Sequence, residues 1–293
     1  MKPTLLALSL VLLTQSVIAQ VKKPVTPVKP KPVVDSVKAL RDSTWKAQIK
    51  DKQKTEGLFT FYQDKVSGSA SMYIRKDQLN KEFIYQSFSM GGPAQLFLNQ
   101  NMLRETWVFK MRKVYGRLEF MRCNTNYFYD STNAVSKAKD VDVSDAVFHS
   151  GAVRAEDSLG YLINADSLFI SEKLDMIKPI MPPTVPPTTY FNLGNLVTDK
   201  SGFEKIRSFP QNSDVVVSLA YDNPAPLNGG DRSITDARYV RVKMQHSFIQ
   251  MPENNYTPRF DDPRVGYFTS ESDDVTSLKP TRYHDLIHRW NLV

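Results

Sequence analysis

The sequence is poor in cysteine and glycine, and these shortages exclude several kinds of functional site. Cys123 is the only cysteine in 293 residues, so the chain can form no internal disulfide and no cysteine-ligated zinc site. Its alternating position in "RLEFMRCNTNYF" indicates a buried or half-buried structural thiol. There is no G-x-S-x-G, and Gly91-Gly92-Pro93 and Gly229-Gly230-Asp231 have the composition of turns rather than of a phosphate-binding loop. The residues therefore support neither a serine hydrolase nor a nucleotide site.

Histidine is also scarce, and two of the four histidines are spaced like zinc ligands. In "YHDLIH", His284 and His288 follow the H-E-x-x-H pattern with Asp285 in place of glutamate. That pattern binds zinc from one face of a helix and uses the glutamate as the base. The shorter aspartate misplaces the base, Pro280 lies just upstream, and the five residues after His288 supply no good third ligand. We therefore reject a metal site at His284 and His288, and expect no catalytic residue and no cofactor in this chain.

Long apolar runs are absent except at the N-terminus. Residues 1–19 combine Lys2, the run "LLALSLVLLTQSV" and a small-x-small pattern ending at Ala19. The run is shorter than the roughly 20 residues that a membrane-spanning helix needs. This segment predicts a secretory signal peptide, and hence a secreted, periplasmic or cell-envelope protein without a membrane span.

The positive charge is concentrated near the N-terminus. Residues 20–34, "QVKKPVTPVKPKPVV", contain four prolines and four lysines and predict an extended polyproline-II linker. From Asp35 onward the chain has 33 basic and 31 acidic residues, so the formal charge of +7 falls to +2. A folded part that is nearly neutral gives no support to nucleic-acid binding.

Residues 35–293 are expected to form a β-rich domain. Alternating apolar and aromatic positions predict strands, and a short helix is expected within 33–57. The expected class is α+β, with a predominantly antiparallel meander and a few short helices, one of them ending before Pro179. The Pro-rich residues 179–189 favour a surface loop or a boundary between two parts of the domain. The expected strands are 57–63, 70–75, 82–89, 106–114, 116–123, 214–221 and 238–251.

One segment near the C-terminus combines charge of both signs with aromatic residues. "PRFDDPRVGYFTS" places arginines on both sides of an acidic pair and then exposes a Val-Gly-Tyr-Phe run. This composition favours a tight turn held by arginine–carboxylate contacts, or a surface that docks another domain. With the later Arg-Trp pair, the candidate domain-contact residues are Arg259, Asp261, Asp262, Arg264, Tyr267, Phe268, Arg289 and Trp290.

Several segments together resemble a known family. The quoted residues are "TEGLFTFYQDKVSGSASMYIRKDQLNKEFIYQSFSMGG", "DSLGYLINADSLFISE", "PRFDDPRVGYFTS" and "YHDLIHRWNLV". They resemble the N-terminal, non-catalytic region of secreted bacterial zinc-dependent, metzincin-like metalloproteases, over roughly residues 50–293. The most specific part is "DDPRVGYF" followed by the Arg-Trp-x-Leu segment, which in that family lies at the junction with the catalytic domain.

The resemblance implies an accessory domain whose zinc helix lies downstream of Val293. The expected partner is a peptidase domain of the same or a neighbouring polypeptide, with a peptide substrate as a further possibility. Zinc is expected only in that peptidase domain. The alternative is an independent envelope module that binds peptide or glycan through the aromatics Tyr73, Phe83, Tyr85, Phe88 and Trp107.

Overall fold

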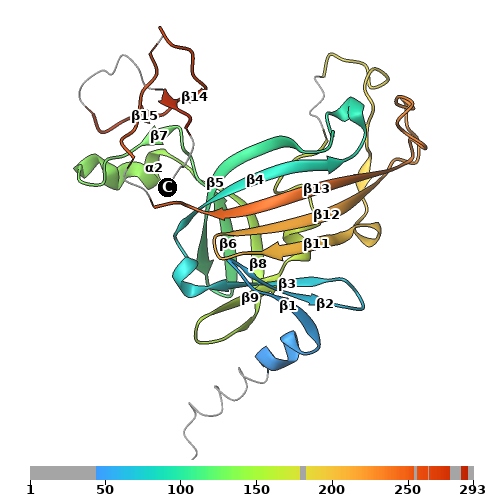
Figure 1. Cartoon of the computed structure of the whole chain (residues 1–293), viewed down its shortest axis with the longest axis horizontal. Coiled ribbons are helices and arrows are strands. Elements are labelled where there is room, and N and C mark those ends of the chain that lie inside the picture. Colours follow the sequence, from blue (N-terminus) through green and yellow to red (C-terminus); the bar gives the residue numbers. More distant parts are fainter. Residues whose placement is uncertain (1–43, 179–182, 254–255, 263, 278–284, 290–293) are drawn as a thin grey trace, which may run out of the picture.

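The computed structural model describes residues 44–178, 183–253, 256–262, 264–277 and 285–289 (Figure 1). The predicted signal peptide and linker lie outside these residues. In these ranges, α-helix is confined to residues 44–49 and to two four-residue helices, α2 (Lys139–Asp142) and α3 (Asp166–Phe169). The fold is therefore mostly β, and the expected α+β class was too helical. The short 3-10 helices are η1 (Lys76–Gln78), η2 (Ala94–Leu96), η3 (Ala134–Ala138) and η4 (Thr198–Lys200).

The helix expected before Pro179 is the clearest local error. Helix α3 ends at Phe169, and residues 170–178 follow as bends and irregular structure. Leu174 and Ile177 in this stretch join the hydrophobic core, and Asp175 is 4% exposed. These three residues lie within one stretch of four, 174–177, and the side chains of all three are buried inside the sheet. Their burial by the surrounding strands outweighs the local preference for a helix.

Twelve of the described strands form one antiparallel sheet that is nearly closed on itself. Its order is β1-β2-β3-β9-β8-β6-β5-β4-β13-β12-β10, with β11 also paired to β12. The strands are β1 (Lys52–Thr55), β2 (Thr60–Asp64), β3 (Ala70–Arg75), β4 (Glu82–Gly91), β5 (Met102–Val114), β6 (Arg117–Arg122), β8 (Ala146–Glu156), β9 (Gly160–Asn164), β10 (Asn195–Leu196), β11 (Gly202–Ser208), β12 (Asn212–Asp222) and β13 (Tyr239–Gln250).

The seven predicted strands are present, but their order is more complex than a meander. β4, β5 and β6 do follow one another in space. However, β3 pairs with β9, and β4 pairs with β13, so strands from both sides of the Pro-rich segment belong to one sheet. The alternation of apolar and polar residues identifies a strand from its own sequence, whereas these two pairings depend on partners far away in the chain.

Hydrogen bonds join the two ends of the sheet. The amide of Leu58 donates to the carbonyl of Phe209 over 2.6 Å, and the amide of Phe59 donates to Ser213 Oγ over 3.1 Å. The hydroxyl of Ser208 donates back to the carbonyl of Phe59 over 2.6 Å. Because these contacts satisfy polar groups at the two edges, the sheet behaves as a barrel whose seam is closed by loops and side chains.

Aromatic side chains fill the interior of the barrel. The inward positions of β4 and β5 alternate with half-exposed ones, as the sequence pattern predicts. Phe109 contacts Phe83 and Phe248 with ring centroids 5.5 and 5.0 Å apart. Such tilted and offset rings add to the stabilisation that burial alone provides. The largest buried aromatics are Tyr85, Tyr221, Phe59, Phe61, Phe109, Phe120, Phe169 and Phe248.

Two projections rise from the barrel on opposite sides (Figure 1). One contains η2, the segment 183–194 and the loop between β12 and β13. Contacts between these pieces include the bond from the Asp231 amide to Gln95 Oε1 and the bond from Asn228 to the carbonyl of Thr188. The other projection is built from described C-terminal residues and from the segment between β6 and β8, which contains α2. Within the described residues, no helix has the length and apolar character needed to cross a bilayer.

Candidate functional site

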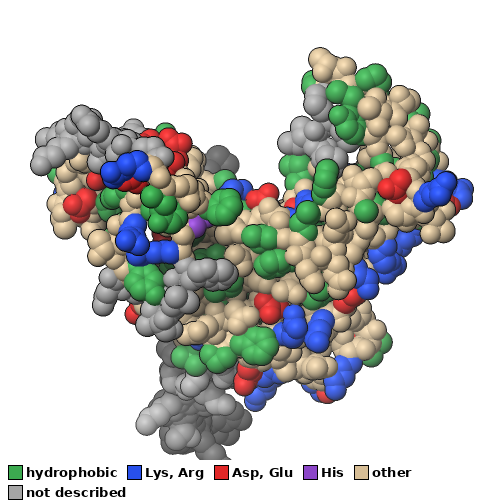
Figure 2. Space-filling view, turned by 45° about the horizontal axis from the view of Figure 1, so that its top comes forward, with side chains coloured by type: hydrophobic (Ala, Val, Ile, Leu, Met, Phe, Trp, Pro, Cys, Tyr) green, Lys and Arg blue, Asp and Glu red, His purple; other side chains and the backbone are tan. Residues whose placement is uncertain are grey.

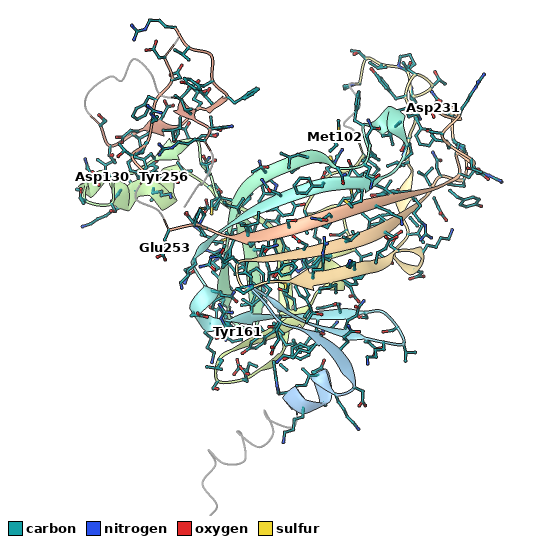
Figure 3. All side chains as sticks on the ribbon, in the orientation of Figure 1. Met102, Asp130, Tyr161, Asp231, Glu253 and Tyr256 are labelled. Atoms are coloured by element: carbon teal, nitrogen blue, oxygen red, sulfur yellow. The ribbon has the colours of Figure 1, made fainter. Side chains whose placement is uncertain are left out.

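The C-terminal lobe contains all the predicted domain-contact residues that the structure describes. We define it as residues 256–262, 264–277 and 285–289, together with 124–138. Within it, β14 (Thr269–Ser270) pairs with β16 (Leu286–Ile287), and β15 (Asp273–Asp274) pairs in parallel with β7 (Tyr127–Phe128). Figure 3 shows Tyr256 and Asp130 in this lobe, and Glu253 where the chain leaves β13. The lobe thus joins the C-terminal segment to the insertion between β6 and β8.

The arginine–aspartate segment forms a turn in this lobe. Arg264 donates to Asp262 with a closest distance of 2.6 Å, and the amide of Val265 closes the turn on the carbonyl of Asp262. Hydrogen bonds from Arg264 hold the pKa of the Asp262 carboxyl below its usual value. The carbonyl of Arg259 accepts from the amide of Ile287, and the amide of Asp261 donates to the carbonyl of Asp285. These hydrogen bonds therefore hold the backbone of the lobe together. The residues that follow the turn, 265–268, are exposed on its surface.

A pocket of about 750 Å³ lies between the lobe and the outer face of β4. Gln86, a half-buried residue on β4, forms the floor. The other lining residues come from the lobe: Gly266, Tyr267, Phe268, His288 and Arg289. Three of the predicted contact residues, Tyr267, Phe268 and Arg289, are thus brought together, and Trp290 lies outside the described residues. Gln86 was not predicted, because it belongs to a strand far away in the chain.

The lobe also exposes large hydrophobic side chains. Phe268 is 87% exposed and Tyr267 is 54% exposed. Figure 2 shows hydrophobic side chains on the surface of this lobe, and a hollow between the lobe and the opposite projection. Clusters of exposed aromatics are uncommon on monomeric proteins and indicate interaction surfaces. The other exposed members of the lobe are Tyr127, Phe128, Val135, Tyr256, Phe260, Val265 and Val275.

Arg289 is held in place at the edge of this pocket. Its guanidinium lies 4.7 Å from the centroid of the Tyr256 ring and donates to the carbonyl of Thr257 over 2.7 Å. Among the described residues, no carboxylate pairs with it. A guanidinium has five donors in a fixed fork. Within the described part of the chain, most of the donors of Arg289 therefore have no protein partner.

Of the two C-terminal histidines that the sequence analysis rejected as zinc ligands, the structure describes one. His284 lies outside the described residues. His288 shares a 2.7 Å hydrogen bond between its Nε2 and Ser270 Oγ, and β16 rather than a helix precedes it. In the described part of the chain, no three side chains of histidine, cysteine, aspartate or glutamate lie close enough together to hold a metal ion.

Cys123 is half-buried, and burial raises the pKa of its thiol to about 11. The thiol is therefore protonated near neutral pH and is a weak nucleophile. This agrees with the structural role that its position in the sequence predicts.

A polar network inside the barrel was not anticipated from the sequence. The carboxylate of Asp175 accepts two hydrogen bonds from Arg104, over 2.9 and 3.0 Å, and one from Ser87 Oγ over 2.7 Å. Close by in the interior, Glu172 Oε1 accepts from the hydroxyl of Tyr221 over 3.1 Å. Both acids belong to the irregular stretch 170–178. These bonds anchor that stretch inside the barrel.

Two buried histidines, His149 and His246, also lie in this interior. His246 Nδ1 lies 2.8 Å from the hydroxyl of Tyr85, and His149 Nδ1 lies 3.3 Å from Lys173 Nζ. The Nε2 atom of each ring is buried and has no hydrogen-bond partner among the described residues. Burial lowers the pKa of each imidazole to about 4, with the charge of Lys173 contributing at His149. Because the histidines are far apart in sequence, only the folded barrel reveals that both face its interior.

Comparison with known proteins assigns a family to most of the chain. Residues 99–293 match DUF5117, a domain of unknown function. The match includes β5 to β13 and the whole C-terminal lobe. No curated protein and no solved structure matches the chain. The matched region covers more than half of the 293 residues, and the chain therefore belongs to the DUF5117 family.

Proposed function

We propose that this protein is a non-catalytic accessory domain of a secreted zinc-metalloprotease-like protein. In this proposal the C-terminal lobe packs against a peptidase domain of the same or a neighbouring polypeptide, and zinc is bound by that domain. The observation that carries the proposal is the exposed aromatic surface of the lobe. It includes Tyr267 and Phe268, which border a pocket of about 750 Å³ on the barrel.

The energetics of this surface favour a protein partner. Burying one Phe or Tyr side chain contributes on the order of 1.5–3 kcal/mol. A surface that exposes Tyr267, Phe268 and Phe260 therefore has the aromatic composition of a protein interface. The peptidase class of the partner rests on the resemblance of "DDPRVGYF" and the Arg-Trp segment to a protease junction.

The alternative, an envelope module that binds glycan or peptide on an aromatic sheet face, loses its main support. Phe83, Tyr85 and Trp107 are all buried in the barrel core. Tyr73 packs against Trp45, and Phe88 is half-buried. Phe83, Tyr85 and Trp107 are therefore core residues, and the five aromatics form no exposed row for stacking.

Co-elution tests the proposal. The full chain would be mixed with the zinc peptidase domain encoded in the same or the adjacent reading frame and analysed by size-exclusion chromatography. We expect co-elution that Phe268→Asp abolishes. Val66→Asp is the matched control, because Val66 is 99% exposed on the β2–β3 turn. Independent migration of the two proteins would contradict the proposal. So would EDTA-sensitive peptide cleavage by this chain alone that His284→Ala removes.

A further inference from the structure

The pocket beneath the lobe has the chemistry of a receptor for an acidic peptide. We infer that it binds an extended segment in which a carboxylate side chain lies between apolar side chains. This inference rests on the proposed function, since it specifies what the partner presents to the lobe. It adds the recognition chemistry, which the proposed function leaves open.

The charge of the lining selects an anion. Arg289 contributes a fixed guanidinium, His288 an imidazole and Gln86 an amide, whereas none of the six lining residues is acidic. A carboxylate can accept two parallel hydrogen bonds from a guanidinium, which gives both affinity and orientation.

The apolar neighbours of the carboxylate follow from the aromatic lining, because Tyr267 and Phe268 border the pocket together with Arg289. Ile84, Gln86 and Phe88 alternate with buried residues along β4 and so lie on its outer face. Side chains two positions apart on a strand are roughly 6.6 Å apart. The face therefore presents an apolar, a polar and a second apolar group in a row. Of this row, Gln86 lines the pocket together with Tyr267 and Phe268, and Ile84 and Phe88 flank it along β4.

Recognition of this kind occurs through side chains rather than by addition of a strand. β4 is paired with β5 on one side and with β13 on the other. Its backbone hydrogen-bonding groups are thus already used, and a bound peptide must lie over its face. The amide of Gln86 makes no hydrogen bond with the described residues and can pair with the backbone of such a peptide.

The test is fluorescence anisotropy of the full chain with three labelled, terminally blocked peptides. They are GSLDLFSG, its neutral counterpart GSLNLFSG, and GSSDSSSG, which keeps the acid but lacks apolar side chains. We expect the first peptide to bind at least tenfold more tightly than either of the others. Its binding should weaken as salt is raised, because the contact is partly electrostatic.

Variants then assign the preference to Arg289. Arg289→Gln should reduce binding of the acidic peptide to the level of the neutral one and leave the neutral one unchanged. Arg289→Lys should retain a weakened preference, because it keeps the charge without the fork. Arg264→Gln is the matched control, since Arg264 lies in the same lobe outside the pocket and pairs with Asp262. Circular dichroism would confirm that each variant is folded.

The outcomes separate this inference from the proposed function. Equal binding of acidic and neutral peptides, no binding of any peptide up to 1 mM, or an Arg289→Gln variant that keeps the preference would overturn the inference. Co-elution with the peptidase domain would still stand in those cases. A peptide preference that depends on Arg289, together with no co-elution, would instead support the pocket as an acidic-peptide site and contradict the protease partner.

Discussion

The buried ion pair between Arg104 and Asp175 should be a major contributor to the stability of the barrel. The side chain of Asp175 is only 2% exposed and that of Arg104 is 18% exposed. Asp175→Asn preserves the size of the side chain but leaves the guanidinium of Arg104 without its counterion. Removal of one partner from a buried pair typically costs about 3–5 kcal/mol. At about 2–4 °C per kcal/mol for a domain of this size, the melting temperature should fall by roughly 6–20 °C.

Thermal and urea unfolding of the full chain, followed by circular dichroism, would measure this loss. Asp262→Asn is the matched control, because Asp262 pairs with Arg264 at the surface, where Arg264 is 86% exposed. Surface pairs of this kind contribute little, so the control should unfold like the wild type. The double variant Arg104→Gln/Asp175→Asn should lose less than the sum of the two single variants. An Asp175→Asn variant as stable as the control would refute the assigned role of the network.

Two further perturbations test the interior and the seam. Because the pKa of His246 is about 4 in the folded barrel and 6.5 in the unfolded chain, the unfolded state binds more protons between these values. Stability should therefore decrease by about 2–4 kcal/mol as pH falls from 6.5 to 4, and His246→Gln should flatten that slope in urea titrations at each pH. At the seam, a Cβ on Gly57 would lie 2.3 Å from Ser208 Oγ and 2.5 Å from the Phe209 amide. Gly57→Ala should therefore cost about 1–3 kcal/mol in urea unfolding.

Each of these two predictions is checked against a control. Gly202→Ala adds the same methyl group in β11, where no atom lies within 4 Å, and should leave the unfolding midpoint unchanged. Equal effects at Gly57 and Gly202 would argue against a closed seam. Identical pH slopes in the wild type and in His246→Gln would show that this imidazole is not neutral in the folded interior.

Local pattern found the seven expected strands but not β1, β9, β10 or β11. In β4, the alternation in "EFIYQSFS" correctly predicts a strand with Phe83, Tyr85 and Ser87 on one face. The same pattern does not identify the partner of β4, because pairing with β13 depends on residues far along the chain. The closure of the sheet into a barrel was invisible for the same reason: Leu58 and Phe209 meet only after every intervening strand is in place.

The candidate site was likewise only partly predictable from the sequence. Composition alone singled out Tyr267 and Phe268, because two consecutive aromatics after a charged turn are unusual at a surface. Gln86 was missed, since nothing in a strand residue indicates which loop will cover it. The interior network was also missed: Asp175 occupies a segment that looked helical, and its partner Arg104 lies on another element. Buried charge pairs of this kind are products of the tertiary fold rather than of local sequence.

Hydrogen–deuterium exchange of the full chain, with and without the zinc peptidase domain, tests the central claim most directly. The account predicts slower exchange in residues 264–270 and 285–289 of the lobe and in β4 beneath it when the domain is added. Phe268→Asp should remove that protection. No change in these segments, or protection confined to the opposite projection, would contradict the assignment of the C-terminal lobe as the docking surface.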